Sequence, residues 1–502
     1  MPDLPEKPQD DAIASDGAAD GSDASVGAVV GASEGHTPKG LSGRLAGMPL
    51  GRQVFVLAVW PFLQQLLSWS VSFVDTAVAG HLTGEALGAI AVGGYVNWFM
   101  GLMVMGIGAG GAALIARAVG GGHKGLANAG VGQTLLLGTI ASGVVGLVVI
   151  AMAHPIGWAT GLRGEALWLC KQYLWITAAG LPVAAVLYVS VSCMTAAGDT
   201  RSPFFIMLGM NIVNLGATLF LAGITYGPAD DPKTFGLMLG VPGIGLGTVI
   251  GWGTGAIAIT ILLLKNRNGG IRLHPHRLRP HWHTIQRIWR VAYPNLLDRG
   301  GHWVGNWIII MIVGEIGRRA LQADTIQGAH IIAIRIEAIS FLPALAFAAA
   351  AATLTGQYLG ANDPRMARRA ARFCWFLGAG IMFVLGLIFV AIPEVLVRSL
   401  TPIPELLELA APLVRLCGFV QFFFGSALVL QGAMRGAGDT RIPAILSNTM
   451  TWGFRLPLAA FFGLYLGWGL YGIWVALCTE LTVRGLVFIT RYQGTGWLKA
   501  KV

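Results

Sequence analysis

The stretch Gly198-Asp199-Thr200-Arg201-Ser202-Pro203 recurs in this chain of 502 residues as Gly438-Asp439-Thr440-Arg441-Ile442-Pro443, after a shift of 240 positions. The same shift superimposes Gly88-Ala89 on Gly328-Ala329 and Val119-Gly120 on Leu359-Gly360. Matches at one constant offset indicate that two halves of the chain repeat a single plan. In a soluble chain such a period would indicate duplicated domains, and in a membrane chain it indicates two lobes around a central path.

The composition places the chain in a membrane. Hydrophobic residues make up 55% of it, charged residues 12%, and the mean hydropathy is +0.66, whereas soluble domains are about 25% charged. Four runs lack Asp, Glu, Lys and Arg: 97–115, 134–152, 174–194 and 376–392. Each is close to the roughly 20 residues that a helix needs to cross a bilayer core. Continuous apolarity excludes the alternating pattern of a barrel, so we expect an all-α polytopic membrane protein.

The apolar pattern predicts twelve transmembrane helices. Their expected ranges are 54–80, 87–115, 128–152, 169–195, 203–225, 240–264, 291–313, 326–355, 373–393, 409–434, 443–464 and 468–490. Lys and Arg are concentrated in alternate loops, which the positive-inside rule places in the cytoplasm. We call the two repeated stretches, 198–203 and 438–443, the GDTR turns. Both termini and both GDTR turns are therefore expected to be cytoplasmic. Six helices in each half give the halves equal orientation, so the two lobes should be related by a pseudo-two-fold along the membrane normal.

These spans divide the chain into five parts. Residues 1–45 are rich in Asp, Ala, Gly and Ser, and are expected to be a disordered cytoplasmic tail. An N-lobe is expected over 50–264, a basic cytoplasmic linker over 265–290, a C-lobe over 291–490, and a short cytoplasmic tail over 491–502. The linker carries seven Lys and Arg residues and no acid. A positive-inside loop explains this charge, and a lipid head-group or regulatory site is the alternative.

Metal and nucleic acid are not expected as partners. The basic residues are spread over loops instead of forming one face. The linker histidines (His274, His276, His281 and His283) have no Cys or acid beside them. The five cysteines are scattered through apolar stretches, without CxxC pairing, and are interpreted as small buried hydrophobic residues.

Asp75 is the strongest candidate for a functional residue, because an ionisable group near the centre of a membrane helix costs at least about 2.5–3.5 kcal/mol. It lies in the first span, and Ser68 and Ser72 share its helical face. A buried carboxylate of this kind can take up and release a proton near neutral pH, or bind Na⁺ where further oxygens surround it. The alternative is a hydrogen-bonded link between helices.

Further polar candidates lie in both lobes. In the N-lobe they are Asn97, Asn211, Asn214 and Thr218. In the C-lobe they are Asp298, Arg335 and Glu337. Interhelical hydrogen bonds and ion pairs are the alternative roles for all of them. Neither a GK[ST] phosphate loop, nor HExxH, nor GxSxG occurs, so the chain is not expected to be an enzyme.

The pattern resembles the multidrug and toxic compound extrusion (MATE) transporters. The resemblance rests on VDTAVAGHL at 74–82, RIEAISFLP at 335–343, TLTGQYLGA at 353–361 and the paired GDTR turns, and it covers roughly 50–490. It implies a MATE-like fold of twelve helices in two six-helix lobes. It also implies export of organic, mainly cationic and amphipathic compounds by alternating access, in exchange for H⁺ or Na⁺.

The resemblance is closer to the branch whose coupling aspartate lies in the first helix of the N-lobe, which Asp75 matches. In sodium-coupled members of one branch an acid follows the fifth-helix Asn by four, and here that position holds Thr218. In another branch an acid lies within the tenth helix, and here only Glu408 stands at its edge. A lone carboxylate is a poorer Na⁺ site than a paired one, so H⁺ is the expected coupling ion, with Na⁺ less favoured and no other cofactor.

A flippase for lipid-linked or phosphorylated amphipathic cargo is the competing hypothesis. Such cargo would favour a cationic central cavity. The arginines that could line it, unless they pair with acids, are Arg299, Arg335, Arg415 and Arg455. For either function we expect a monomer in the plasma membrane, which in bacteria is the inner membrane. The sequence leaves the identity of the transported compound open.

Overall fold

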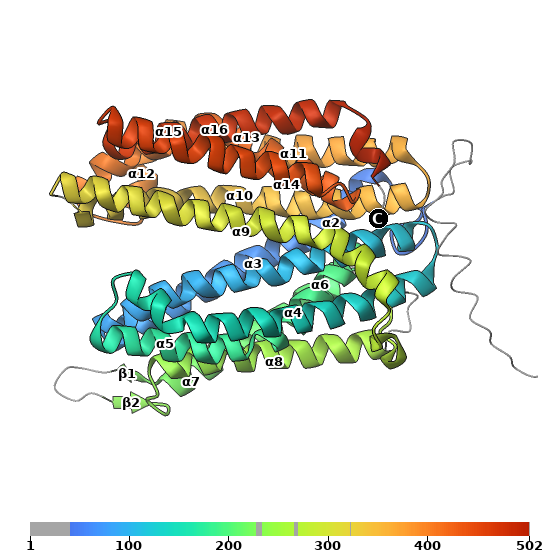
Figure 1. The fold of residues 1–502 in the computed structure, drawn as a ribbon, viewed down its shortest axis with the longest axis horizontal. Helices are drawn as coiled ribbons and strands as arrows, with labels where there is room; N and C mark the ends of the chain where they lie inside the picture. Colours follow the sequence, from blue (N-terminus) through green and yellow to red (C-terminus); the bar gives the residue numbers. More distant parts are fainter. Residues whose placement is uncertain (1–40, 227–232, 266–269, 322, 501–502) are drawn as a thin grey trace, which may run out of the picture. The chain divides into compact units, whose positions relative to one another are not determined.

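The computed structural model describes residues 41–226, 233–265, 270–321 and 323–500, except for the side chains of a few residues in 69–81 and 224–233 and those of Ala323 and Asp324. These residues belong to one compact unit. Figure 1 shows long helices lying side by side. We use "N-lobe" for helices α2 to α8 and "C-lobe" for helices α9 to α16.

The N-lobe consists of seven helices and one small hairpin. The helices are α2 (Leu50–Leu82), α3 (Gly84–Gly120), α4 (Lys124–Ala159), α5 (Gly164–Ala179), α6 (Leu181–Ala196), α7 (Arg201–Ala222) and α8 (Val241–Lys265). Strands β1 (Ile224–Tyr226) and β2 (Lys233–Phe235) pair antiparallel, with Ile224 opposite Phe235. This hairpin is the one departure from an all-α fold in the described part of the chain.

The C-lobe follows a short 3₁₀ turn, η1 (Pro275–Leu278). Its elements are α9 (Trp282–Arg319), α10 (Ala323–Gly360), α11 (Pro364–Ala391), α12 (Pro393–Arg398), α13 (Pro404–Gly436), α14 (Arg441–Asn448), the π-helix η2 (Thr449–Arg455), α15 (Leu456–Ala460), the π-helix η3 (Phe461–Tyr465), α16 (Gly469–Gln493) and the 3₁₀ turn η4 (Gly496–Lys499).

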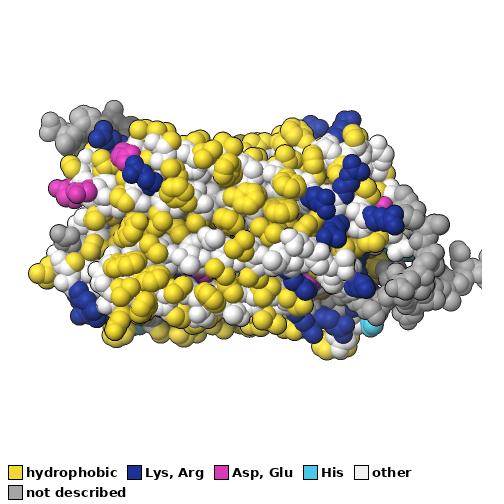
Figure 2. All heavy atoms as spheres, turned by 90° about the horizontal axis from the view of Figure 1, so that it is seen from above, with side chains coloured by type: hydrophobic (Ala, Val, Ile, Leu, Met, Phe, Trp, Pro, Cys, Tyr) yellow, Lys and Arg dark blue, Asp and Glu magenta, His cyan; other side chains and the backbone are white. Residues whose placement is uncertain are grey.

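The membrane class and the helical fold are confirmed. Eight described helices are long and apolar enough to cross a bilayer, and the pair α5 and α6, bent by 52°, forms a ninth candidate span. The three remaining expected spans coincide with α2, with α9, and with the run from α14 to η3. The count of twelve stays a prediction. Figure 2 shows the hydrophobic side chains that cover the middle of one face, with Lys and Arg nearer its ends.

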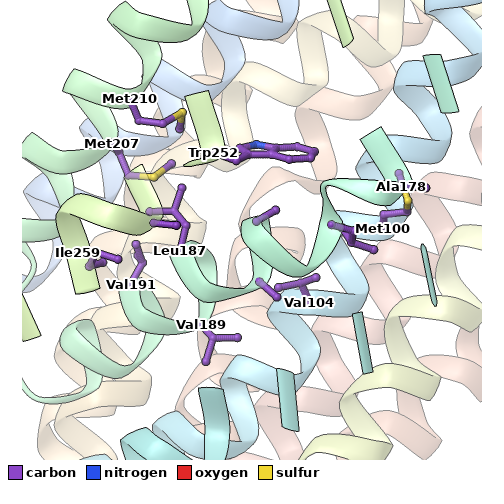
Figure 3. Close-up of a cluster of buried hydrophobic side chains, with 14 of the residues drawn as sticks. Met100, Val104, Ala178, Leu187, Val189, Val191, Met207, Met210, Trp252 and Ile259 are labelled. Carbon is purple, nitrogen blue, oxygen red and sulfur yellow. The ribbon is translucent and has the colours of Figure 1, made fainter. Parts of the chain in front are cut away.

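The N-lobe has a continuous apolar core. Side chains such as Met100, Leu187, Met210 and Trp252 meet in it from α3, α6, α7 and α8 (Figure 3). Glycines at four-residue spacing in α8 (Gly243, Gly247, Gly251 and Gly255) lie against α7, and Gly255 also contacts Leu187 of α6. Small residues at this spacing let membrane helices approach closely, which fixes the position of α7.

Helix α2 packs into two different cores. Leu57 and Ala58, near its start, belong to a cluster with α10, α11, α13 and α16 of the C-lobe. Val78 and Ala79, near its end, belong to the N-lobe core. Pro61 lies in the helix between these two parts. The helix that carries Asp75 therefore connects the two lobes.

Both GDTR turns have the geometry that their residues favour. Gly198 and Gly438 adopt φ values of 90° and 85°, a left-handed conformation that glycine tolerates best. Asp199 accepts a hydrogen bond from the Ser202 amide at 3.1 Å and pairs with Arg44 at 2.7 Å. Asp439 pairs with Arg491 at 2.7 Å. We call the end of the bundle where both turns lie the GDTR end.

The boundaries of the expected tail and linker differ from the structural elements. Residues 1–40 lie outside the described part, but Ser42 and Arg44 already make polar contacts with the lobes, and Leu45 is buried. In the linker, residues 266–269 lie outside the described part. Its final residues belong to α9, which begins at Trp282. Contacts with the lobes thus begin before residue 50, and α9 begins before residue 291.

Candidate functional site

Asp75 lies seven residues before the end of α2. Its side chain is partly buried, and its Oδ1 atom is shielded from solvent without a hydrogen-bond partner among the described residues. A buried polar atom in this state is rare, because the lost hydration is not replaced. Such an atom is suited to a proton or a cation that binds and leaves. The side chain of Ser72, its expected neighbour, lies outside the described residues.

Asp75 shares a polar cluster with two residues of the N-lobe. The side chain of Asn97 in α3 hydrogen-bonds Tyr173 in α5, and Asp75 is close enough to interact electrostatically with the same tyrosine. Tyr173 is 3% exposed. It packs on Gly93, where a Cβ would lie only 2.5 Å from its ring. The structure therefore brings Asn97 towards Asp75 and adds Tyr173, which the sequence analysis did not select.

The α7 candidates lie in a different setting. Asn214 and Thr218 are buried against the glycine stripe of α8, because a Cβ at Gly251 would meet Asn214 at 2.8 Å and one at Gly247 would meet Thr218 Oγ1 at 2.4 Å. Asn211 is also buried, and its Nδ2 has no partner among the described residues. This packing joins α7 to α8 by close contact, and Thr218 Oγ1 has no hydrogen-bond partner among the described residues.

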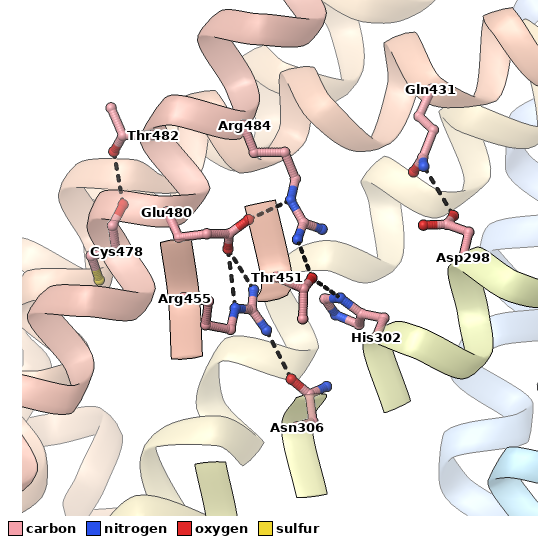
Figure 4. A network of polar contacts seen from close by, with 10 residues as sticks. All are labelled: Asp298, His302, Asn306, Gln431, Thr451, Arg455, Cys478, Glu480, Thr482 and Arg484. Carbon is pink, nitrogen blue, oxygen red and sulfur yellow. Dashed lines mark hydrogen bonds and ion pairs between the residues drawn. The ribbon is translucent and has the colours of Figure 1, made fainter. Parts of the chain in front are cut away.

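Asp298 in α9 belongs to an ion pair. Its carboxylate accepts hydrogen bonds from two residues of α13, from Arg435 at 2.7 Å and from Gln431 at 3.1 Å, the latter drawn in Figure 4. The side chain of Asp298 is 7% exposed. A charged partner thus compensates this buried acid, whereas the Asp75 Oδ1 has no partner among the described residues. The geometry favours the structural alternative that the sequence left open for Asp298.

A buried network in the C-lobe centres on Glu480 of α16, which is fully buried. Its carboxylate accepts hydrogen bonds from Arg455 at 2.7 Å and from Arg484 at 2.6 Å (Figure 4). Arg484 also reaches Thr451 at 3.0 Å, and Arg455 reaches Asn306 at 2.8 Å. All three charges fall within the expected spans 443–464 and 468–490.

The backbone near this network is unusual. Thr451 and Arg455 lie in the π-helix η2, and a π-turn shifts later side chains around the helix axis, often at functional sites. His302 of α9 contacts the Thr451 hydroxyl at 3.3 Å. Two arginines share one acid here, so the network retains a positive charge. The signal in the sequence was charge alone: Glu480 and Arg484 are four residues apart on one helix face.

Arg335 and Glu337 separate in the structure, as their spacing predicts. Arg335 is exposed, whereas the side chain of Glu337 hydrogen-bonds Cys417. Glu337 stands 240 positions after Asn97, and Arg335 stands 240 after Tyr95. Aligned on the helix prolines Pro61 and Pro294, Asp75 corresponds to Ile308, so no acid occupies its equivalent position in α9. The two lobes thus differ in chemistry at equivalent positions.

Two of the four arginines considered for cationic cargo pair with acids. Arg455 pairs with Glu480, and Arg415 pairs with Glu394 at 2.7 Å on an exposed surface. Arg299 is next to Asp298 in α9, and its Nε has no partner among the described residues. No group of three or more His, Cys, Asp or Glu residues in the described ranges could hold a metal ion.

Aromatic side chains meet between the lobes. The ring of Tyr95 in α3 stacks on Trp303 of α9 with centroids 4.9 Å apart, and Phe99 lies 4.6 Å from the same indole. Trp307 is 5.5 Å from both Tyr95 and Trp303. The Tyr95 hydroxyl and the Trp303 Nε1 have no partner among the described residues. Electron-rich ring faces with free polar atoms suit cationic aromatic compounds.

The lobes also meet at the GDTR end, through α3 and α10. A Cβ at Gly120 would lie 1.9 Å from the main-chain oxygen of Gln357, and one at Gly360 would lie 2.0 Å from that of Arg117. The contacts are reciprocal, since Gln357 and Gly360 follow Arg117 and Gly120 by 240 positions. The absence of a Cβ lets the two helices touch, and this contact closes the bundle at the GDTR end.

Comparisons with known proteins agree with this arrangement. The MatE family model matches residues 62–219 and again residues 301–461, once in each half. The chain belongs to the MatE family. Its repeat is therefore the repeat of MATE transporters, and the family resemblance of the sequence is confirmed. The role of Asp75 within the family pattern stays a prediction.

Individual relatives cover nearly the whole chain. A protein of Thermotoga maritima named probable multidrug resistance protein NorM is 25% identical over 90% of this chain and 94% of its own length. The multidrug resistance protein PmpM of Pseudomonas aeruginosa is 26% identical over 88% of this chain and 90% of its own. Among solved structures, an aspartate-to-asparagine mutant of the Vibrio cholerae MATE transporter VcmN superposes with a TM-score of 0.78. It is 18% identical and covers 88% of this chain and 96% of its own, which shows the fold alone.

Proposed function

We propose that this MATE transporter is a proton-coupled antiporter that exports organic, mainly cationic and amphipathic compounds from the cell. The observation that carries the proposal is the Oδ1 of Asp75, the one acid in α2, which is shielded from solvent without a partner among the described residues. The names of the relatives, multidrug resistance proteins in two bacteria, support this class of cargo. Asp75 is the coupling residue, and Asn97 and Tyr173 shape its surroundings.

Coupling requires that the proton and the cargo favour different states of the protein. Protonation of Asp75 removes its charge, which weakens its attraction for a cationic compound and favours release. Loss of the proton restores the charge and resets the N-lobe. Because α2 packs into both lobes, a change of charge at Asp75 can alter how the lobes pack together.

Sodium coupling is the less favoured alternative. A Na⁺ site needs several oxygen ligands around the ion. Here Thr218 Oγ1 is buried against α8, and the neighbours of Asp75 in its cluster, Asn97 and Tyr173, carry no charge at neutral pH. A single carboxylate with neutral neighbours is sufficient for one proton.

The packed α3–α10 contact supports a state that is closed at the GDTR end, which we assign to the cytoplasm because of its arginines. In this state the aromatic cluster of Tyr95, Phe99, Trp303 and Trp307 lies between the lobes. We propose this cluster as part of the cargo path. The chain would act as a monomer in the plasma membrane, with both termini in the cytoplasm.

Flux in proteoliposomes tests the proposal. An imposed proton gradient should drive efflux of a fluorescent organic cation, whereas a Na⁺ gradient should drive little. The Asp75→Asn variant should lose gradient-driven efflux by at least about tenfold, the effect of about 1.4 kcal/mol. Glu315→Gln is the control, because Glu315 lies near the end of α9 and pairs with Arg318 and Arg319. Unchanged efflux by Asp75→Asn would overturn the mechanism.

The flippase hypothesis has less support. It needs unpaired cationic side chains along the central path. Arg415 and Arg455 are paired with acids, which leaves Arg299 and Arg335 of the four. The same vesicles can carry a fluorescent lipid-linked phosphate. Movement of that lipid, without movement of organic cations, would favour the flippase over the antiporter.

A further inference from the structure

A pocket opens in the C-lobe at the GDTR end, between the start of α9 and the start of α14. Its volume is about 470 Å³, and it is lined by Gln286, Trp289, Arg290, Tyr293 and Arg441. Four of these residues recur at three- and four-residue spacing along one face of α9. Arg441 belongs to the second GDTR turn and faces them from α14.

The pocket is cationic. Its described lining contains two arginines and no acid. Neither Arg290 nor Arg441 forms an ion pair with any described residue. The Arg441 guanidinium lies 5.7 Å from the centre of the Tyr293 ring, and this contact holds it over the pocket. Two guanidinium groups without acids around one hollow suit a phosphate, since arginine donates paired hydrogen bonds to phosphate oxygens.

The same two helix faces become apolar one turn further along. Leu297 follows Tyr293 by four residues and is 64% exposed, and Ile445 follows Arg441 by four residues and is also 64% exposed. Trp289 is 44% exposed at the pocket itself, and exposed tryptophan is typical of the level of lipid head groups. The order along the helices is therefore cationic pocket, aromatic ring and exposed apolar strip, which matches a phosphate followed by acyl chains.

The N-lobe lacks an equivalent pair of arginines. Arg441 corresponds to Arg201 at the shift of 240. In the first helix of each lobe the prolines Pro61 and Pro294 align, which pairs Tyr293 with Trp60 but Arg290 with Leu57. Arg201 lies over the rings of Trp60 and Phe205, at 5.9 and 5.7 Å. The positive-inside rule asks only for arginines near the cytoplasmic surface. It does not account for two arginines around one pocket in one lobe alone.

We propose that this pocket binds the phosphate of an anionic phospholipid, with the acyl chains lying along Leu297 and Ile445. Arg290 and Arg441 bind the phosphate oxygens, Gln286 donates to the same group, and the Trp289 ring marks the head-group level. The apolar strip selects a membrane lipid over a soluble phosphate. The lipid links α9 to α14, so it stabilises the GDTR end of the C-lobe.

Native mass spectrometry of the purified, delipidated transporter tests this site. The probes are phosphatidylglycerol, phosphatidylcholine with the same chains, and inorganic phosphate. The wild type should retain phosphatidylglycerol in preference to the other two. Each of Arg290→Gln and Arg441→Gln should weaken that binding about fivefold, from the contribution of one arginine near an anionic head group, and the double variant about 25-fold. Arg201→Gln is the matched control and should leave binding unchanged.

Three outcomes would overturn the proposal. They are equal retention of phosphatidylcholine, equal binding of inorganic phosphate, and an equal loss in Arg201→Gln, which would indicate general surface charge. Thermal unfolding of each lipid-free variant shows whether it is folded, and the single variants replace the double one if it is not. Because binding is measured without transport, the result is independent of the coupling role of Asp75.

Discussion

Arg117 and Gln357 occupy equivalent positions in the two repeats, and each donates a hydrogen bond to the main chain of the other lobe. Arg117 Nη2 reaches the Ala437 oxygen at 2.7 Å, and Gln357 Nε2 reaches the Ala196 oxygen at 2.8 Å. Both acceptors lie just before a GDTR turn. The repeat thus provides a reciprocal pair of contacts that holds the GDTR end closed. Arg117 also donates to the Ala500 oxygen at 2.6 Å, so the C-terminal segment takes part.

Removing either donor should loosen this end. We expect Arg117→Ala to have the larger effect, because hydrogen bonds from charged groups contribute about 1.5–3 kcal/mol and those from neutral groups about 0.5–1.5 kcal/mol. Hydrogen exchange of the final turns of α3 and α10 is the measurement, and both turns should exchange faster in each variant. Exchange that increases only in the helix that carries the substitution would contradict a reciprocal contact between lobes.

The glycine contact between α3 and α10 should be intolerant of a methyl group. A Cβ at Gly120 would lie 1.9 Å from the Gln357 main-chain oxygen, so the helices must separate in Gly120→Ala. Overpacking of this kind costs about 1–3 kcal/mol. Gly94→Ala in the same helix is the control, because nothing lies within 4 Å of a Cβ there. Thermal unfolding should show a loss for Gly120→Ala alone, and equal stability of the two variants would count against the contact.

The Glu480 network should be sensitive to loss of its acid. Glu480→Gln leaves Arg455 and Arg484 buried without a compensating charge, and breaking a buried pair typically costs 3–5 kcal/mol. Glu394→Gln is the control, since Glu394 and Arg415 are 48% and 49% exposed and such pairs contribute about 0–1 kcal/mol. Unfolding in denaturant measures the loss of stability in both variants. Similar small losses in the two variants would mean that water or other groups solvate the arginines.

The fold was largely predictable because membrane helices leave clear signals. Long apolar runs, the positive-inside loops and the 240-residue repeat predict the helices, their order and the paired lobes. The sequence predicts less well where a helix carries charge or changes geometry. Helix α9 contains Asp298 and Arg299 and is not among the strongly apolar spans. The π-helices η2 and η3 interrupt the last-but-one predicted span, and no residue pattern considered in the sequence indicated them.

The site was predictable in part, for a physical reason. A single acid such as Asp75 stands out in the sequence, because placing a carboxylate in a membrane helix costs free energy and therefore indicates a function. Its surroundings depend on which helix faces turn towards each other, and this is tertiary information. Thus Tyr173 was missed, since one tyrosine in an apolar run looks like ordinary core. Asn214 and Thr218, four residues apart, share a helix face, and that face lies against the α8 glycines.

Tyr173 should contribute to coupling through its hydroxyl and to folding through its ring. Tyr173→Phe keeps the ring against Gly93 but releases Asn97, whose amide can then donate to the Asp75 carboxylate and favour its ionised form. We expect the pH dependence of cation efflux to move to lower pH, with folding little changed, because one neutral hydrogen bond contributes about 0.5–1.5 kcal/mol. Tyr173→Ala loses the packing as well and should cost about 3–5 kcal/mol, as aromatic truncations in cores do. Efflux across a pH series and thermal unfolding of both variants separate the two effects. A pH profile of Tyr173→Phe that coincides with the wild type would restrict Tyr173 to packing and leave Asp75 with Asn97 alone.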